Sequence, residues 1–176
     1  MSVFVGIDPG LGLTSVTVLG RSRVPPSEFE VYNIQGKKLR GPERLDYLLE
    51  QMRITLFPTA ATLVAVEGYS FGSQNAREAM GEWGGLLRWL LWKDGYRFIV
   101  VPPTTLKKFT TGKGNAKKDM MILEVFKKWG YSAQSNDDAD SYALAQLAKA
   151  FHAGGGTKQF KKLASKLEVA HRVGAA

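Results

Sequence analysis

The amino-acid sequence predicts an α/β domain with a five-stranded mixed sheet flanked by helices. Three strand-like segments come first, before any helical pattern, and strand-like and helical segments alternate after them. The 176 residues, 44% of them hydrophobic, suit one domain with a substantial core. Initial strands that meander, followed by strand–helix crossovers, give a mixed sheet with helices on both of its faces.

The first part of the chain has the pattern of antiparallel strands. Residues 3–8 are typical of a short buried strand that Pro9-Gly10 ends, and residues 14–19 are rich in β-branched side chains, so the two segments should form a hairpin. Residues 29–34 alternate apolar and polar side chains and predict a third strand. A helix is expected over residues 44–56, where apolar residues recur at helical spacing: Leu45, Leu48, Leu49 and Met52.

The later segments alternate between strand and helix. In order, they are a strand over residues 62–67, a helix over about 75–92, a strand over 98–101 and two helices at about 117–129 and 138–153. Glu67 ends the first of these strands, and Pro102-Pro103 follows the second. The long helix places four apolar side chains on one face: Met80, Trp83, Leu87 and Leu91. This order of elements is the pattern of the ribonuclease-H-like fold.

The chain is expected to divide into a folded domain, residues 1–153, and a tail, residues 154–176. The tail opens with a Gly-rich joint and continues as a basic segment. No apolar run reaches the roughly 18 residues that span a bilayer. The N-terminus lacks the basic and apolar stretches of a secretory signal. We therefore expect a cytoplasmic protein.

The formal net charge of +8 and the sequence pI of about 9.7 favour a polyanionic partner, although a basic protein without such a partner is the alternative. Cysteine is absent and only two histidines occur, His152 and His171. A metal site in this chain would therefore rely mainly on oxygen ligands, which select hard ions such as Mg²⁺ or Mn²⁺.

Four carboxylates are candidates for such a site. Asp8 and Glu67 end two strands, and if these strands are adjacent and parallel, both side chains emerge at one edge of the sheet. Asp137 and Asp140 are three residues apart and share one face of a helix, whereas Asp138 points elsewhere. Two Mg²⁺ ions about 4 Å apart would relieve the repulsion and promote phosphodiester hydrolysis. The alternative is that Asp8 belongs to a turn and the later acids are helix caps.

These residues resemble the RuvC family of Holliday junction resolvases. The resemblance spans about residues 3–150 and is carried by Gly6-Ile7-Asp8-Pro9-Gly10, Val66-Glu67-Gly68, Asp137-Asp138-Ala139-Asp140, Pro103-Thr104-Thr105-Leu106-Lys107, and the run from Thr111 to Lys118. It looks closest to the shorter RuvC-like enzymes of bacteriophages. The resemblance implies that Asp8, Glu67, Asp137 and Asp140 bind the catalytic ions. It also implies a homodimer that places two active sites on opposing strands of a four-way junction and leaves 5′-phosphate nicks.

The same resemblance places Lys107 and Lys118 at the DNA near the cleavage point. Lys108, Lys113 and Lys117 lie in the same basic, Gly-containing stretch, which suits phosphate contacts; the alternative is a solvated helix face. The family often has an aromatic wedge at the position of Ser70. The residues on either side, Tyr69 and Phe71, are the candidates for stacking on a base at the branch, or for core packing.

The long helix over residues 75–92 carries Trp83, Trp89 and Trp92 between glycines, which suits either a dimer interface or the core. Two other functions compete with the nuclease. One is a non-catalytic module that binds branched DNA, which would not need four complementary acids. The other is an actin-like ATPase, whose phosphate-binding hairpin the segment from Asp8 to Thr14 partly fits, although such proteins are usually much longer.

Overall fold

The computed structural model describes residues 2–20, 28–56, 61–68, 74–154, 162 and 169–170. Its sheet contains the strands β1 (Phe4–Pro9), β2 (Leu13–Leu19), β3 (Phe29–Gln35), β4 (Leu63–Glu67), β5 (Phe98–Val101) and β6 (Val169–Ala170). They are hydrogen-bonded in the order β3-β2-β1-β4-β5-β6. The first three strands are antiparallel to one another, β4 and β5 continue in parallel from β1, and β6 closes the edge antiparallel to β5.

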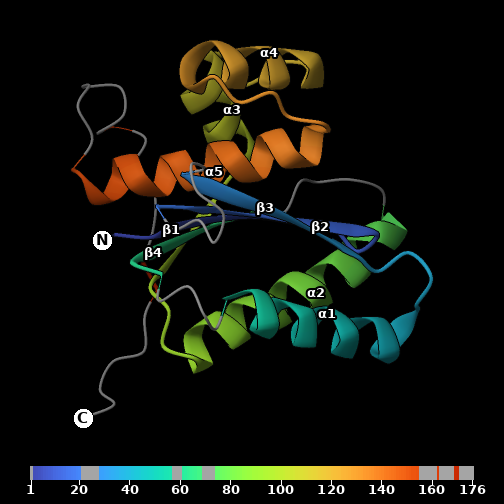
Figure 1. The fold of residues 1–176 in the computed structure, drawn as a ribbon. Coiled ribbons are helices and arrows are strands. Elements are labelled where there is room, and N and C mark those ends of the chain that lie inside the picture. The colour runs from blue at the N-terminus through green and yellow to red at the C-terminus, as the bar shows by residue number, and fades with distance from the viewer. Residues whose placement is uncertain are drawn as a thin grey trace.

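Five helices of the described part of the chain cover the two faces of this sheet (Figure 1). On one face lie α1 (Gly41–Leu56) and α2 (Gln74–Lys93), and on the other lie α3 (Pro103–Thr111), α4 (Lys118–Trp129) and α5 (Asn136–His152). Among the described residues, no helix is both long and apolar enough to cross a membrane.

The predicted mixed sheet with helices on both faces is confirmed, and each of the five predicted strands agrees with the structure to within one residue at either end. Two elements were not predicted. The first is α3, whose threonines and leading proline are poor helix formers. Pro103 is tolerated because it occupies the first turn, and Gly112 ends the helix at φ 80° with its N–H on the carbonyl of Lys108. The second is the two-residue β6, which lies within the predicted tail.

The alternation of side chains along β1 and β4 divides the core into two layers. Val5 and Ile7 of β1 pack toward α1 and α2, where Trp83, Leu87 and Leu91 are fully buried. Phe4 and, on β4, Leu63 and Ala65 pack toward α5. The sequence left open whether the tryptophans of the long helix belong to the core or to a dimer interface. In the structure Trp83 is a core residue, whereas Trp89 and Trp92 are 44% and 45% exposed.

Gly6 sets how closely α5 approaches the sheet. A Cβ atom at this position would lie 2.0 Å from the carbonyl oxygen of Ser141 and 2.4 Å from the backbone nitrogen of Ala145. No other residue fits without moving the helix, because the obstacle is backbone. The glycine of the Gly6-Ile7-Asp8 motif therefore lets α5 pack directly on the backbone of β1.

Candidate active site

Two of the predicted acids stand at the carboxyl ends of neighbouring parallel strands. Ile7 pairs with Val66, so Asp8 and Glu67 come next along β1 and β4. Side chains alternate between the faces of a strand, and both acids are in phase with the residues that pack toward α5. Their carboxyl groups emerge on the same face and at the same edge, close enough for each to influence the pKa of the other.

The first turns of α5 bring the other two acids to this edge. The helix follows an N-cap at Ser135, whose side chain accepts a hydrogen bond from the backbone N–H of Asp138 at 3.1 Å. Asp137 and Asp140 are three residues apart and therefore share one face of the helix. The helix N-terminus carries a partial positive charge, which favours negative side chains in this turn.

Burial and mutual repulsion raise the pKa of three of the carboxyl groups. Burial is the largest cause for Asp8, whose pKa lies well above its ordinary value, and the charges of the other three acids add to it. Burial also raises the pKa of Glu67 to about 7, with the charge of Asp140 acting in the same direction. For Asp140, burial and then the charge of Asp137 raise the pKa to about 6. All four acids are thus within electrostatic reach of one another.

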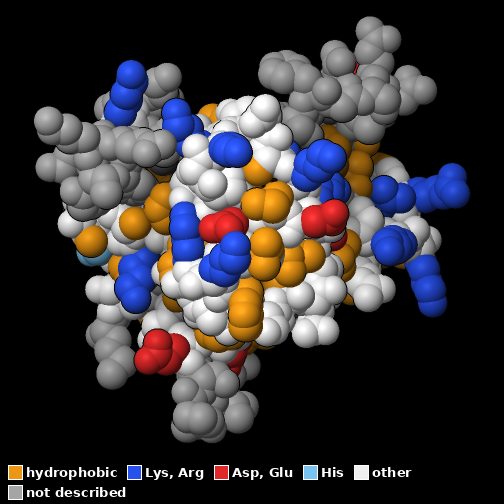
Figure 2. Space-filling view, turned by 90° about the horizontal axis from the view of Figure 1, so that it is seen from above, with side chains coloured by type: hydrophobic (Ala, Val, Ile, Leu, Met, Phe, Trp, Pro, Cys, Tyr) orange, Lys and Arg blue, Asp and Glu red, His pale blue; other side chains and the backbone are white. Residues whose placement is uncertain are grey.

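Two lysines lie close enough to this cluster of four acids to oppose the rise in pKa of Glu67 and Asp140. Lys107, in α3, lowers the pKa of both Glu67 and Asp140, and Lys118, the first residue of α4, lowers that of Asp140. Figure 2 views the molecule from the side of α3, α4 and α5 and shows Lys and Arg side chains spread widely over this face. Lys107 and Lys118 thus place positive charge beside the acidic cluster.

The remaining DNA-binding candidates divide into two groups. Lys108, Lys113 and Lys117 are exposed near the end of α3 and in the loop that leads into α4. Tyr69 and Phe71 lie outside the described residues, so their stacking on DNA stays a prediction.

The donor set fits a hard cation. It consists of carboxylate oxygens, which Mg²⁺ and Mn²⁺ prefer, and Asp140 Oδ1 is buried with no hydrogen-bond partner in the structure. In the part of the chain that the structure describes, however, no three His, Asp or Glu side chains form a ready-made cage for an ion. The acids are thus gathered closely enough to repel one another, and ion binding would require their side chains to adjust.

One polar contact of the acidic turn was missed by the sequence analysis. Asp138 is only 4% exposed, and its Oδ1 accepts hydrogen bonds from Asn33 Nδ2 at 2.8 Å and from Ser15 Oγ at 3.4 Å. The available signal was in β2, where the polar side chains of Ser15 and Thr17 share one face of the strand. Both are fully buried, and such polar side chains require partners.

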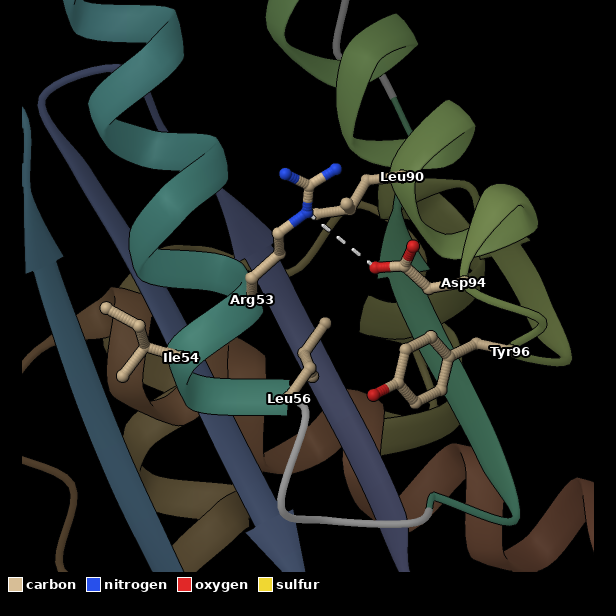
Figure 3. Close-up of a pocket in the computed structure, with 6 residues that line it drawn as sticks. All are labelled: Arg53, Ile54, Leu56, Leu90, Asp94 and Tyr96. Atoms are coloured by element: carbon tan, nitrogen blue, oxygen red, sulfur yellow. Dashed lines mark ion pairs between the residues drawn. The ribbon is translucent and has the colours of Figure 1, made fainter.

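A groove of about 600 Å³ lies elsewhere, between the end of α1 and the end of α2 (Figure 3). It is lined by Arg53, Ile54, Leu56, Leu90, Asp94 and Tyr96. These residues precede β4 or β5 or belong to the ends of the helices before them, so the groove is at the amino ends of the parallel strands. The acidic cluster is at their carboxyl ends, and the groove is not part of it.

A three-stranded antiparallel meander that continues into parallel strands, with acids where β1, β4 and α5 meet, defines a ribonuclease-H-like domain with an acidic site. Comparison with solved structures bears out this fold. Thermus thermophilus RuvC superposes with a TM-score of 0.67 at 21% identity, over 86% of this chain and 96% of that one. A structure described as T. thermophilus RuvC in complex with a Holliday junction substrate superposes with a TM-score of 0.70 at 19% identity, over 97% and 100%.

Sequence comparison identifies the family. The family model for crossover junction endodeoxyribonuclease RuvC matches residues 4–147. The crossover junction endodeoxyribonuclease RuvC of Chloroherpeton thalassium is 26% identical over 169 residues, which are 93% of this chain and 90% of the relative. The chain belongs to the RuvC family of crossover junction endodeoxyribonucleases. The predicted family and enzyme class are thereby confirmed.

Proposed function

We propose that this protein is a metal-dependent endonuclease that resolves Holliday junctions by paired phosphodiester hydrolysis and leaves nicks with 5′-phosphate ends. The observation that carries the proposal is the convergence of Asp8, Glu67, Asp137 and Asp140 from two strands and a helix on one edge of the sheet. Membership of the RuvC family supports the junction as substrate, and the relative solved with a Holliday junction substrate has the same fold.

These four carboxylates would hold the ions, two Mg²⁺ per site with Mn²⁺ able to replace them. When bound, the ions would supply activation of a water and stabilisation of the leaving 3′ oxygen. The chain itself supplies the rest. Carboxylates on two strands and a helix fix where the ions lie, and burial keeps bulk water from screening their charge. Without ions, burial and repulsion keep the proton on Asp8 well above its ordinary pKa.

The lysines would bring the scissile phosphate to the acids. Lys107 and Lys118 stand close enough to the acidic cluster to lower pKa values within it, so a phosphate bound by these lysines would lie beside the acids. Lys108, Lys113 and Lys117 would extend the contact along the backbone, together with Tyr69 or Phe71 at the branch and the basic tail on the DNA arms. Such contacts make affinity fall steeply with salt.

The proposed protein is a homodimer that acts in the cytoplasm. Paired nicks on opposing strands require two active sites, which a homodimer supplies. The exposed face of α2 supports it. Trp89 and Trp92 lie on this face, and Gly85 has nothing within 4 Å of the place a Cβ would occupy, so another helix has room to approach.

The test is cleavage of a labelled immobile four-way junction and a matched linear duplex with Mg²⁺, Mn²⁺ or EDTA. We expect symmetrically paired nicks near the branch, only with a divalent ion and not on the duplex. Binding without any cleavage would indicate a non-catalytic module that binds junctions. Equal cleavage of both substrates would support a nuclease but contradict its selectivity for branched DNA.

A further inference from the structure

The acid between the site carboxylates has a role of its own. We infer that Asp138 is a positioning residue: Asn33 of β3 and Ser15 of β2 hold its carboxylate and thereby fix the direction in which Asp137 and Asp140 point. The inference rests on the proposed function, because it concerns how the acidic turn is prepared for an ion.

Helix geometry gives the contact its effect. Successive side chains on an α-helix are rotated by about 100°, so Asp138 projects about 100° away from Asp137 and about 160° away from Asp140. While the two site acids face the edge of β1 and β4, Asp138 faces β2 and β3. Rotation of α5 about its axis would swing the site acids away from Asp8 only by breaking the 2.8 Å bond to Asn33.

Neighbouring bonds hold the same turn along its axis. Ser141 Oγ lies 2.9 Å from both Ser15 Oγ and Thr17 Oγ1, and it donates to the carbonyl oxygen of Asp138 at 3.1 Å. Ser15 therefore contacts both Asp138 and Ser141. The acidic turn of α5 is tied to β2, the strand that is hydrogen-bonded to the strand carrying Asp8.

The chemistry of Asp138 suits this role better than a packing role. It is a nearly fully buried carboxylate, and neither of the ion pairs in the described part of the chain includes it. Packing alone would be served by an apolar side chain, since burying a charge is costly. Its Oδ1 accepts hydrogen bonds from two strands, β3 through Asn33 and β2 through Ser15, which suits a contact that holds an orientation.

The experiment measures Mn²⁺ binding to the full-length protein without DNA, by electron paramagnetic resonance of the free ion. Asn33→Ala is the first variant, because Asn33 is exposed on β3 and its loss opens no core. Residues that orient metal ligands typically change ion affinity by about 10- to 100-fold, and we expect about a 10-fold weaker affinity here. Junction binding in EDTA should be unchanged.

Two further variants separate positioning from general stability. Gln146→Ala removes a side-chain hydrogen bond of the same helix, the 3.1 Å bond to Tyr142, and should lower thermal stability without changing Mn²⁺ affinity. Asn33→Asp combined with Asp138→Asn exchanges the partners and rebuilds the bond in reverse, so it should recover the affinity that Asn33→Asp alone loses.

The inference is overturned if Asn33→Ala binds Mn²⁺ as tightly as the unaltered chain, or if the exchanged pair is no better than Asn33→Asp alone. The proposed function fails in a different way. In that case the unaltered protein would not bind Mn²⁺, or Asp8→Asn would bind it equally well.

Discussion

Charged side chains are arranged in opposite ways at the two ends of the parallel strands. At the amino ends, Arg53 and Asp94 face each other across the groove with Nε and Oδ2 3.9 Å apart (Figure 3). At the carboxyl ends, Asp8 and Glu67 meet the acids of α5, and the pKa of both stays raised although Lys107 lies within electrostatic reach of Glu67.

The difference indicates which end has its charges paired within the chain and which end requires a ligand. An exposed ion pair is complete in itself and contributes little to folding. A buried cluster of like charges destabilises the fold until something positive binds to it. The carboxyl end therefore points to a ligand.

Replacement of the cluster acids should have the largest effect. Asp8→Asn, Glu67→Gln or Asp140→Asn should lower single-turnover junction cleavage by more than about 100-fold, the upper end of what residues that merely support a ligand cause. Junction affinity by gel shift should stay the same or rise, because each variant removes an acidic group from the face proposed to bind DNA. Full activity in Asp140→Asn would contradict the proposed metal site.

The position of α5 should be the next most sensitive feature. Gly6→Ala places a methyl group against the backbone of Ser141, so α5 must shift and the acids move with it. We expect a loss of about 1–3 kcal/mol in the free energy of unfolding, measured with urea, together with reduced cleavage.

Gly85→Ala in α2 is the matched control, since a Cβ there meets nothing within 4 Å. It should leave stability unchanged or raise it by up to about 1 kcal/mol. A Gly6→Ala protein as stable and active as the unaltered chain would show that α5 does not need its close contact with β1.

The convergence of the four acids on one edge of the sheet could be predicted from sequence because the direction of each side chain follows from local rules. A period of two along β1 and β4 puts Asp8 and Glu67 on one face, and a spacing of three puts Asp137 and Asp140 on one helix face. The contact between Asp138 and Asn33 joins residues 105 positions apart, so no local sequence pattern predicts it. The helix α3 was missed for another reason: tertiary packing of Leu106 and Thr110 overrides weak helix propensity.

The metal-free cluster should make stability depend on pH. Because folding raises the pKa of Glu67 from 4.5 to about 7, the folded chain holds protons that the unfolded chain releases. Stability in EDTA should therefore fall by roughly 3 kcal/mol as the pH rises from about 4.5 to about 7 and level off above that. Thermal melts across this range would measure it. Glu67→Gln should reduce the slope, to which Asp8 and Asp140 also contribute, and added Mn²⁺ should flatten it. A slope unchanged by both would have another origin.

The ion pair at the opposite end should have the smallest effect. Both of its side chains are substantially exposed, at 50% for Arg53 and 35% for Asp94, so solvent screens their attraction. A double-mutant cycle of Arg53→Ala and Asp94→Ala should give a coupling energy below about 1 kcal/mol in urea unfolding. Junction cleavage and its metal dependence should not change in either variant. A marked loss of cleavage would break the contrast, because it would place part of the working surface at the amino ends of the strands.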